Sequence, residues 1–317
     1  MGVSAVSAAD VLRLDPATRL ARRLARSISF RLRRLFSNQT WRAVKRTVLF
    51  PARNFLLRSK PLRIQVANES FFLAPQGTVP LAIWEGGYFG EHELNFVLRI
   101  LRPGMTFIDV GANVGFFSIP AAKAVGSGKG FAFEPTALTC RSLAKNLQLN
   151  RINNVEATCS ALGDYEGQVL LQINASGKDG YNTIGRPTRP DSHVVATAQV
   201  PITRLDVFLR QKSIAHIDVM KIATEGSELF VLRGASGILE QPQAPLILYA
   251  CGKLTAGFGY HAVESVWFLE PFGYHFFVLD SASGLIRKFK GARDFDCILI
   301  AVKPQHALYS VVEGLAT

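Results

Sequence analysis

The residues best suited to chemistry lie in one short turn, D-V-G-A-N-V-G at residues 109–115, which follows an apolar run. A buried strand that ends in a glycine turn and continues into a helix presents backbone N–H groups to a carboxylate or phosphate. Gly111 and Gly115 lack Cβ atoms at points where a ligand must approach the backbone closely. Asp109 and Asn113 add polar side chains, so the turn is typical of a site for a nucleotide-like ligand.

The spacing within this turn separates two such ligands. Dinucleotide folds carry G-x-G-x-x-G, in which the second glycine lets the backbone approach a pyrophosphate. Here Asn113 stands at that position and obstructs the approach. S-adenosylmethionine fits better, because its amine and carboxylate can use Asp109, the Asn113 side chain and the loop N–H groups. A nicotinamide-dependent oxidoreductase is therefore the less favoured alternative.

A second carboxylate completes the pattern. Glu134 ends the next apolar run, at residues 130–133. A carboxylate at that strand end accepts hydrogen bonds from both ribose hydroxyls, whichever nucleoside carries the ribose. Because a single β-α-β unit accounts for both Glu134 and the glycine turn, the two together favour a nucleoside ligand more strongly than the turn does by itself.

Strands that alternate with helices must position these residues. Apolar runs predict strands at residues 106–110, 130–133, 155–159, 217–222 and 246–249. Helical periodicity predicts helices at residues 91–101, 114–125, 138–149, 226–239 and 261–269. This alternation predicts an α/β fold with a doubly wound parallel sheet.

Several further elements surround that sheet. Final strands are expected at residues 274–279 and 295–302, the second antiparallel, and a small β-hairpin at residues 62–66 and 70–73. Residues 168–200 read as short strands with Gly/Pro-rich loops, which is where a substrate lid over the strand ends is expected.

The ordered motifs resemble those of FkbM-type methyltransferases, a class I S-adenosylmethionine-dependent family, over residues 91–274. The matching motifs, in chain order, are Glu91, R-P-G at 102–104, D-V-G-A-N-V-G at 109–115, A-F-E-P at 132–135, N-L-Q-L-N at 146–150, A-L-G-D at 161–164, N-T-I at 182–184, R-L-D at 204–206, the run 218–228 and V-L-R-G-A at 231–235. The resemblance implies a Rossmann-like class I methyltransferase fold and S-adenosyl-L-methionine as cofactor. It also implies O-methylation of a hydroxyl on a sugar, glycolipid or secondary metabolite.

The resemblance also implies roles for residues outside the turn. Ser160 stands where related enzymes use a polar contact to the adenine amine, and Asp164 follows in the matching A-L-G-D. Asp164 fits the start of a turn equally well. The predicted cofactor-binding residues are therefore Asp109, Gly111, Asn113, Gly115, Glu134, Ser160 and Asp164.

Two candidate bases follow Lys221 at a strand-to-helix junction. Glu225 and Glu228 stand where a carboxylate can accept the proton of an acceptor hydroxyl. Glu228 fits a charge stabilised by a helix N-terminus equally well. Lys221 lies inside an apolar strand, so it is expected either to pair with a carboxylate such as Asp218 or to extend its charge towards water.

The chain departs from the family at two places. The pattern near Lys221 resembles K-I-D-V-E-G-x-E, but Ala223 and Thr224 replace the aspartate and valine. The family usually closes a later strand with a glutamate, where Tyr249 and Ala250 stand here. In class I methyltransferases the acidic residue that ends the fourth strand points at the methyl-transfer site, so the resemblance implies that its loss removes a charge from the place where substrate or a metal would bind. A cofactor-binding protein that has lost catalysis is therefore a second candidate, and no metal site is predicted.

The four cysteines are widely spaced and lack C-x-x-C motifs. Cys140, Cys159, Cys251 and Cys297 are therefore expected to be buried, reduced thiols of a cytoplasmic protein.

The basic excess lies at the N-terminus. Residues 1–60 hold 14 Lys or Arg against two aspartates, which matches the net charge of +12 of the whole chain. Leucines and arginines at residues 19–35 form a basic amphipathic pattern, which suits an anionic membrane surface, packing on the domain or a partner, or a targeting sequence. Nucleic-acid binding is not expected, because aromatic residues other than Phe30 do not interleave with these arginines. The partner expected at the active site is a small-molecule, glycan or lipid-linked acceptor.

Four segments are expected. They are a basic helical extension at residues 1–60, the hairpin and a leading helix at 61–104, the methyltransferase domain at 105–303, and a C-terminal tail at 304–317. Because 18 consecutive apolar residues do not occur, a membrane-spanning helix is not expected.

Overall fold

The computed structural model describes residues 62–66, 69–73, 90–175, 179–291 and 296–316. These residues fall into two compact units. The first contributes residues 62–66, 69–73 and 179–180, and the second contributes the remainder. The predicted basic helix at residues 19–35 lies outside the described residues. In the part of the chain that is described, no helix is long and apolar enough to cross a membrane.

The predicted hairpin is confirmed. Strand β1 (Leu62–Val66) pairs antiparallel with strand β2 (Glu69–Leu73), and Leu62 lies opposite Leu73. Strand β2 begins at Glu69, one residue earlier than the sequence predicts.

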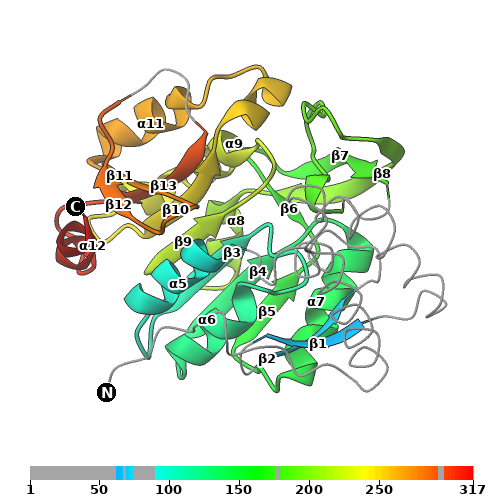
Figure 1. Ribbon diagram of the computed structural model, residues 1–317, viewed down its shortest axis with the longest axis horizontal. Coiled ribbons are helices and arrows are strands. Elements are labelled where there is room, and N and C mark those ends of the chain that lie inside the picture. Colours follow the sequence, from blue (N-terminus) through cyan, green and yellow to red (C-terminus); the bar gives the residue numbers. More distant parts are fainter. Residues whose placement is uncertain (1–61, 67–68, 74–89, 176–178, 292–295, 317) are drawn as a thin grey trace, which may run out of the picture. The chain divides into compact units, whose positions relative to one another are not determined.

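An eight-stranded sheet forms the centre of the second unit, with the strand order β12-β11-β13-β10-β9-β3-β4-β5 (Figure 1). Its strands are β3 (Thr106–Val110), β4 (Lys129–Phe133), β5 (Val155–Thr158), β9 (Val219–Ile222), β10 (Leu246–Cys251), β11 (His275–Leu279), β12 (Ile286–Lys288) and β13 (Cys297–Val302). Strand β13 runs antiparallel between β10 and β11, as predicted for the last strand. The sheet is therefore mixed, with a doubly wound parallel part.

Helices cover this sheet. They are α5 (Glu91–Ile100), α6 (Ser118–Val125), α7 (Ala137–Leu149), α8 (Leu205–Gln211), α9 (Glu228–Arg233), α10 (Ser236–Glu240), α11 (Val263–Leu269) and α12 (Tyr309–Leu315). Helix α6 contacts β3 and β4, α7 contacts β5, and α9 contacts β10. Short 3-10 turns are η2 (Asp179–Tyr181), η3 (Lys253–Phe258) and η4 (Glu270–Phe272).

The two faces of the sheet differ in what they bury. On one face Ile108 and Val110 join a buried apolar cluster with α8, α9, α10 and α11. The ring of Phe208 lies 4.8 Å from that of Phe133 within this cluster. Because side chains alternate along a strand, Asp109 and Lys221 project from the other face, towards α6. The apolar alternation thus places one ion pair on the side opposite the main cluster.

The expected lid region is more regular than the sequence predicts. Strand β7 (Gly167–Asn174) pairs antiparallel with β8 (Val194–Thr203), and β6 (Ala161–Leu162) completes a three-stranded sheet. Most residues of β8 are exposed, so the strand lacks the apolar alternation that a half-buried strand shows. This exposure explains why two long strands read as short strands and loops.

Other boundaries also differ from the prediction. Helix α6 begins at Ser118 instead of residue 114, because Asn113 and Gly115 have positive φ and cannot continue a right-handed helix. The predicted helix at residues 226–239 divides into α9 and α10, separated at Gly234 and Ala235. The predicted C-terminal tail contains α12, and strand β12 was not predicted.

Candidate functional site

The strand order reverses between β3 and β9. From β3 the chain adds β4 and then β5 on one side, whereas β10 lies beyond β9 on the other. In open α/β sheets, ligands bind beyond the carboxyl ends of the strands at such a reversal. The turn after β3, Glu134 after β4 and the loop that follows β9 all leave the sheet at this edge.

Asp109 and Lys221 form a buried ion pair across the two strands at the reversal. They are register partners on β3 and β9, and Oδ1 of Asp109 lies 2.9 Å from Nζ of Lys221. The other oxygen, Oδ2, accepts a hydrogen bond of 2.5 Å from the Ser118 hydroxyl, and the Asp109 side chain has no exposed surface. Lys221 therefore pairs with a carboxylate, as one alternative predicted, but with Asp109 instead of Asp218.

This ion pair also fixes the glycine turn. Nζ of Lys221 donates a second hydrogen bond, of 3.2 Å, to the Gly111 carbonyl. Both carboxylate oxygens of Asp109 accept hydrogen bonds from protein groups. Asp109 can therefore act on a ligand indirectly, because it holds Lys221 in position. A direct contact of Asp109 with the cofactor amine stays a prediction.

The two glycines of the turn are required by protein packing. Gly111 has φ +76°, and a Cβ atom there would clash with the Ala223 carbonyl oxygen. Gly115 has φ +89°, and its Cβ would lie 2.8 Å from a methyl group of Leu143. The structure thus gives close approach of the β9 loop and of α7 as a reason for these glycines, and close approach of a ligand stays a prediction.

The backbone N–H groups of the turn are already used within the protein. Gly111 and Ala112 donate to the Phe133 carbonyl, Asn113 to Glu134, Val114 to the Asn113 side chain, and Gly115 to the Ala112 carbonyl. The expectation that a helix near residue 114 offers unpaired N–H groups was wrong, because α6 starts later. Polar side chains instead remain available at the turn.

Asn113 and Glu134 meet beside the turn. One carboxylate oxygen of Glu134, Oε2, accepts the N–H of Asn113 at 3.1 Å, and Oε1 accepts the N–H of Thr136 at 2.9 Å. A carboxylate oxygen can accept more than one hydrogen bond, and the contact of Glu134 with the ribose hydroxyls stays a prediction. The Asn113 Nδ2 group has no partner among the described residues and is free to donate.

Ser160 and Asp164 lie beyond β5. Ser160 is buried, and its Oγ lies 2.9 Å from the Ala161 carbonyl oxygen and 3.0 Å from that of Pro201. Its proton is used there, but its oxygen can still accept a hydrogen bond from an amine. The half-buried Asp164 side chain forms no hydrogen bond or ion pair with the described residues. The contact of either residue with adenine stays a prediction.

Glu225 and Arg189 form a bidentate ion pair. Nε and Nη2 of Arg189 lie 2.9 Å and 3.4 Å from the two oxygens of Glu225. The guanidinium stacks on Tyr181, with Cζ 4.4 Å from the ring centre. Glu225 has φ +56°, which is rare outside glycine. Burial raises the pKa of Glu225, and the hydrogen bonds and charge of Arg189 oppose that shift.

Glu228, the second candidate base, accepts hydrogen bonds from the backbone of the loop between β9 and α9. Its Oε1 accepts the Thr224 N–H at 3.0 Å, the Thr224 hydroxyl at 3.1 Å and the Gly226 N–H at 3.3 Å. The Tyr260 hydroxyl donates to the Gly226 carbonyl at 2.7 Å from the other side. Burial raises the pKa of Glu228. This arrangement favours the alternative in which Glu228 is a charged residue stabilised at the N-terminus of α9.

The two departures from the family leave uncharged groups near the site. Ala223 follows β9 and lies beside Gly111, and Tyr249 on β10 is buried with its hydroxyl 3.4 Å from the Ser265 hydroxyl. Burial raises the pKa of Tyr249 well above its usual value, so this residue stays neutral. Arg189 was not predicted as a functional residue, because it lies in a Pro-rich loop outside every motif.

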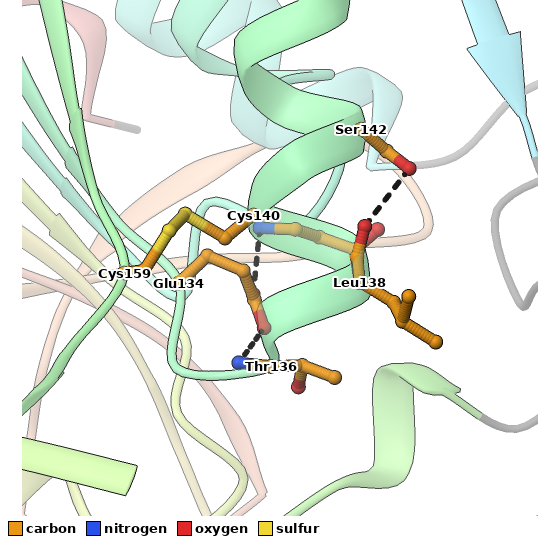
Figure 2. The surroundings of a disulfide bond; sticks show 7 residues. Glu134, Thr136, Leu138, Cys140, Ser142 and Cys159 are labelled. Atoms are coloured by element: carbon orange, nitrogen blue, oxygen red, sulfur yellow. Dashed lines mark hydrogen bonds between the residues drawn. A yellow bond between two sulfur atoms is a disulfide. The ribbon is translucent and has the colours of Figure 1, made fainter.

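The expectation of four reduced thiols was wrong. Cys140 and Cys159 form a disulfide between the first part of α7 and the residue after β5 (Figure 2). Cys251 and Cys297 are free. The 19-residue separation of the first pair gives no hint of the contact, which exists because α7 returns the chain to β5 beside β4.

Comparisons with known proteins agree with the motifs. A model of the methyltransferase FkbM domain matches residues 109–276, slightly more than half of the chain. Methyltransferase 1 of Beauveria bassiana (strain ARSEF 2860) is 25% identical over 142 residues, which cover 40% of this chain and 57% of that protein. Methyltransferase sdnD of Sordaria araneosa is 27% identical over 152 residues, covering 40% and 59%. The chain thus spans less than two thirds of the length of these relatives.

Solved structures show weaker likeness. M. jannaschii TYW2 in complex with AdoMet has a TM-score of 0.41 at 15% identity, covering 77% of this chain and 85% of that one. Cofactor-bound Rv0187 from MTB has a TM-score of 0.38 at 13% identity, covering 67% and 78%. On the match to the domain model, the chain belongs to the FkbM methyltransferase family, whose members use S-adenosylmethionine.

Proposed function

We propose that this protein methylates a hydroxyl oxygen of a small-molecule, glycan or lipid-linked acceptor, and that Glu225 accepts the hydroxyl proton. The observation that supports this most is the place of Glu225. It follows β9 at the reversal of strand order, it is partly buried, and its carboxylate is held by Arg189. The bound cofactor supplies a methyl group already activated on a sulfonium.

The polar groups at the turn suit this cofactor. As a carboxylate, Glu134 is an acceptor for ribose hydroxyl protons, and Asn113 Nδ2 can donate to the methionine carboxylate. Lys221 uses two of its three N–H protons on Asp109 and Gly111, and its Nζ also lies 5.5 Å from the centre of the Phe117 ring. We propose that the third proton also faces the methionine carboxylate.

On the acceptor side, the electrostatics of Glu225 suit a base. Burial raises its pKa towards neutral pH, which makes the ionised carboxylate a better proton acceptor than an exposed glutamate. Its partner Arg189 holds the two oxygens in place through a planar guanidinium. A positioned base contributes about 10²–10⁴-fold to such a reaction, and orientation of the acceptor contributes the larger part.

A cofactor-binding protein without turnover is the second candidate. Ala223 and Tyr249 support it, because both are uncharged where the family pattern has carboxylates.

The basic residues 19–35 support a lipid-linked or membrane-surface acceptor in the first candidate, because an anionic surface attracts such a segment.

An acceptor screen with a radiolabelled methyl donor tests the proposal. Wild-type protein is expected to label a hydroxyl as an alkali-stable ether, and Glu225→Gln to lose about 10²-fold or more in rate while binding S-adenosylhomocysteine normally. Labelling of nitrogen or carbon would contradict O-methylation. Intact cofactor binding with no labelled acceptor, together with activity in Ala223→Asp, would support the second candidate.

A further inference from the structure

We propose that the Cys140–Cys159 disulfide positions Glu134 for the nucleoside of the cofactor, so that a thiol reductant weakens cofactor binding. The inference rests on the proposed contact of Glu134 with the ribose. It concerns cofactor binding, because both cysteines adjoin the residues predicted to hold the nucleoside.

A continuous set of contacts connects the disulfide to the carboxylate (Figure 2). The N–H of Cys140 donates to the Thr136 carbonyl at 2.8 Å, and the N–H of Thr136 donates to Oε1 of Glu134 at 2.9 Å. The other oxygen of Glu134 accepts the N–H of Asn113. The N-terminal end of α7 therefore holds the Glu134 carboxylate in position.

The other cysteine of the disulfide, Cys159, connects the N-terminal end of α7 to the end of β5. Cys159 follows β5 directly and precedes Ser160, the predicted adenine contact. The Glu134 N–H donates to the Thr158 carbonyl at 3.1 Å. Strands β4 and β5 pair as far as Phe133 and Thr158, and beyond that point the backbone hydrogen bond and the disulfide join the loops predicted to hold the ribose and the adenine. Loss of the disulfide leaves the spacing of these loops to hydrogen bonds.

The disulfide is open to exchange from one side. Cys140 is 1% exposed, whereas Cys159 is exposed. A thiolate of a small dithiol attacks the Cys159 sulfur, the S–S bond breaks, and Cys140 leaves as a thiolate that takes up a proton. The second thiol of the reagent then releases Cys159. Two protein thiols form, and the dithiol is oxidised to its own disulfide.

Calorimetric titration of the full chain with S-adenosylhomocysteine tests the proposal, with and without dithiothreitol. Reduction is expected to raise the Kd about tenfold. The double variant Cys140→Ser/Cys159→Ser should bind weakly in both conditions. The double variant Cys251→Ser/Cys297→Ser, whose thiols are free in the native protein, should respond to the reductant as wild type does. Mass spectrometry establishes the thiol state of each sample.

Hydrogen exchange separates a local effect from unfolding. Reduction should speed amide exchange at residues 133–140 and leave the β9 and β10 amides protected. An unchanged Kd in reduced, folded protein would overturn the proposal, and so would weak binding caused by global loss of protection. If the reductant raises the Kd as expected and the oxidised protein methylates no hydroxyl, the proposed function fails while this inference stands.

Discussion

Nζ of Lys221 lies 2.9 Å from Oδ1 of Asp109 inside the sheet, although 112 residues separate them in the chain. The pair joins the two strands at which the strand order reverses, and the same ammonium holds the Gly111 carbonyl. One buried contact thus links the parallel sheet to the turn of the proposed cofactor site.

Replacing Lys221 with methionine should destabilise the fold strongly. The change leaves the Asp109 carboxylate buried with the Ser118 hydroxyl as its remaining partner, and removal of one member of a buried pair costs about 3–5 kcal/mol. Urea unfolding measures the loss. Lys212→Met is the matched control, because Lys212 and Glu156 form an exposed pair expected to contribute about 0–1 kcal/mol. Equal losses in both variants would contradict a structural role for the buried pair.

Gly111→Ala should cost much more stability than Gly104→Ala. Both glycines have positive φ, which costs an alanine about 1–2 kcal/mol. A Cβ at residue 104 meets nothing within 4 Å, whereas one at residue 111 meets the Ala223 carbonyl oxygen. Thermal unfolding of the two variants therefore separates backbone conformation from packing. Similar melting temperatures would show that the turn can move away from β9.

The parallel strands and the hairpin could be predicted because their residues carry local signals. The strand predicted at residues 106–110 has those bounds in the structure, and the helix predicted at residues 91–101 ends one residue earlier, at Ile100. Apolar runs and helical periodicity are local signals, so they can be recognised without tertiary contacts. The meeting of Glu134 with the glycine turn was also predictable, because adjacent parallel strands end at one edge.

What could not be predicted depends on contacts between distant residues. The partner of Lys221 is a register partner on another strand, Arg189 reaches Glu225 from 36 residues away, and Cys140 meets Cys159 through the path of α7. The exposed strand β8 lacks periodicity because one partner strand, not a buried face, stabilises most of it. Such pairings follow from the fold, and local sequence patterns do not record them.

Glu134→Gln should weaken the binding of S-adenosylhomocysteine. An amide has one oxygen acceptor, so it cannot accept both ribose hydroxyl protons and also hold the N–H groups of Asn113 and Thr136. Hydrogen bonds to a charged group contribute about 1.5–3 kcal/mol each, which predicts about a 10- to 100-fold higher Kd by calorimetry. Glu166→Gln is the control, because Glu166 also accepts a backbone N–H, that of Arg204, but at an exposed turn. Unchanged affinity in Glu134→Gln would remove this residue from the cofactor site.

Arg189→Ala should raise the pKa of Glu225 further, because burial of the carboxylate remains while its cation is lost. Besides Glu225, the groups whose charge acts on Arg189 are Tyr181 and Asp191, and Arg189 is the cation that acts on Glu225. Since a base works in its ionised form, the acid limb of the rate profile should move to higher pH. Carbon-13 NMR titration of glutamate-labelled protein measures the same shift without an acceptor, with Glu225→Gln to assign the signal.

The controls for that titration are Arg189→Lys and Arg186→Ala. A lysine restores the positive charge but not the two-contact geometry, so it should return part of the shift. Arg186 lies in the same loop, and its charge is not among the causes that shift the pKa of Glu225, so Arg186→Ala should leave that pKa unchanged. If Arg189→Ala leaves the titration of Glu225 unchanged, the guanidinium does not control this carboxylate in solution, and the ion pair is then a structural contact of the loop without influence on proton transfer.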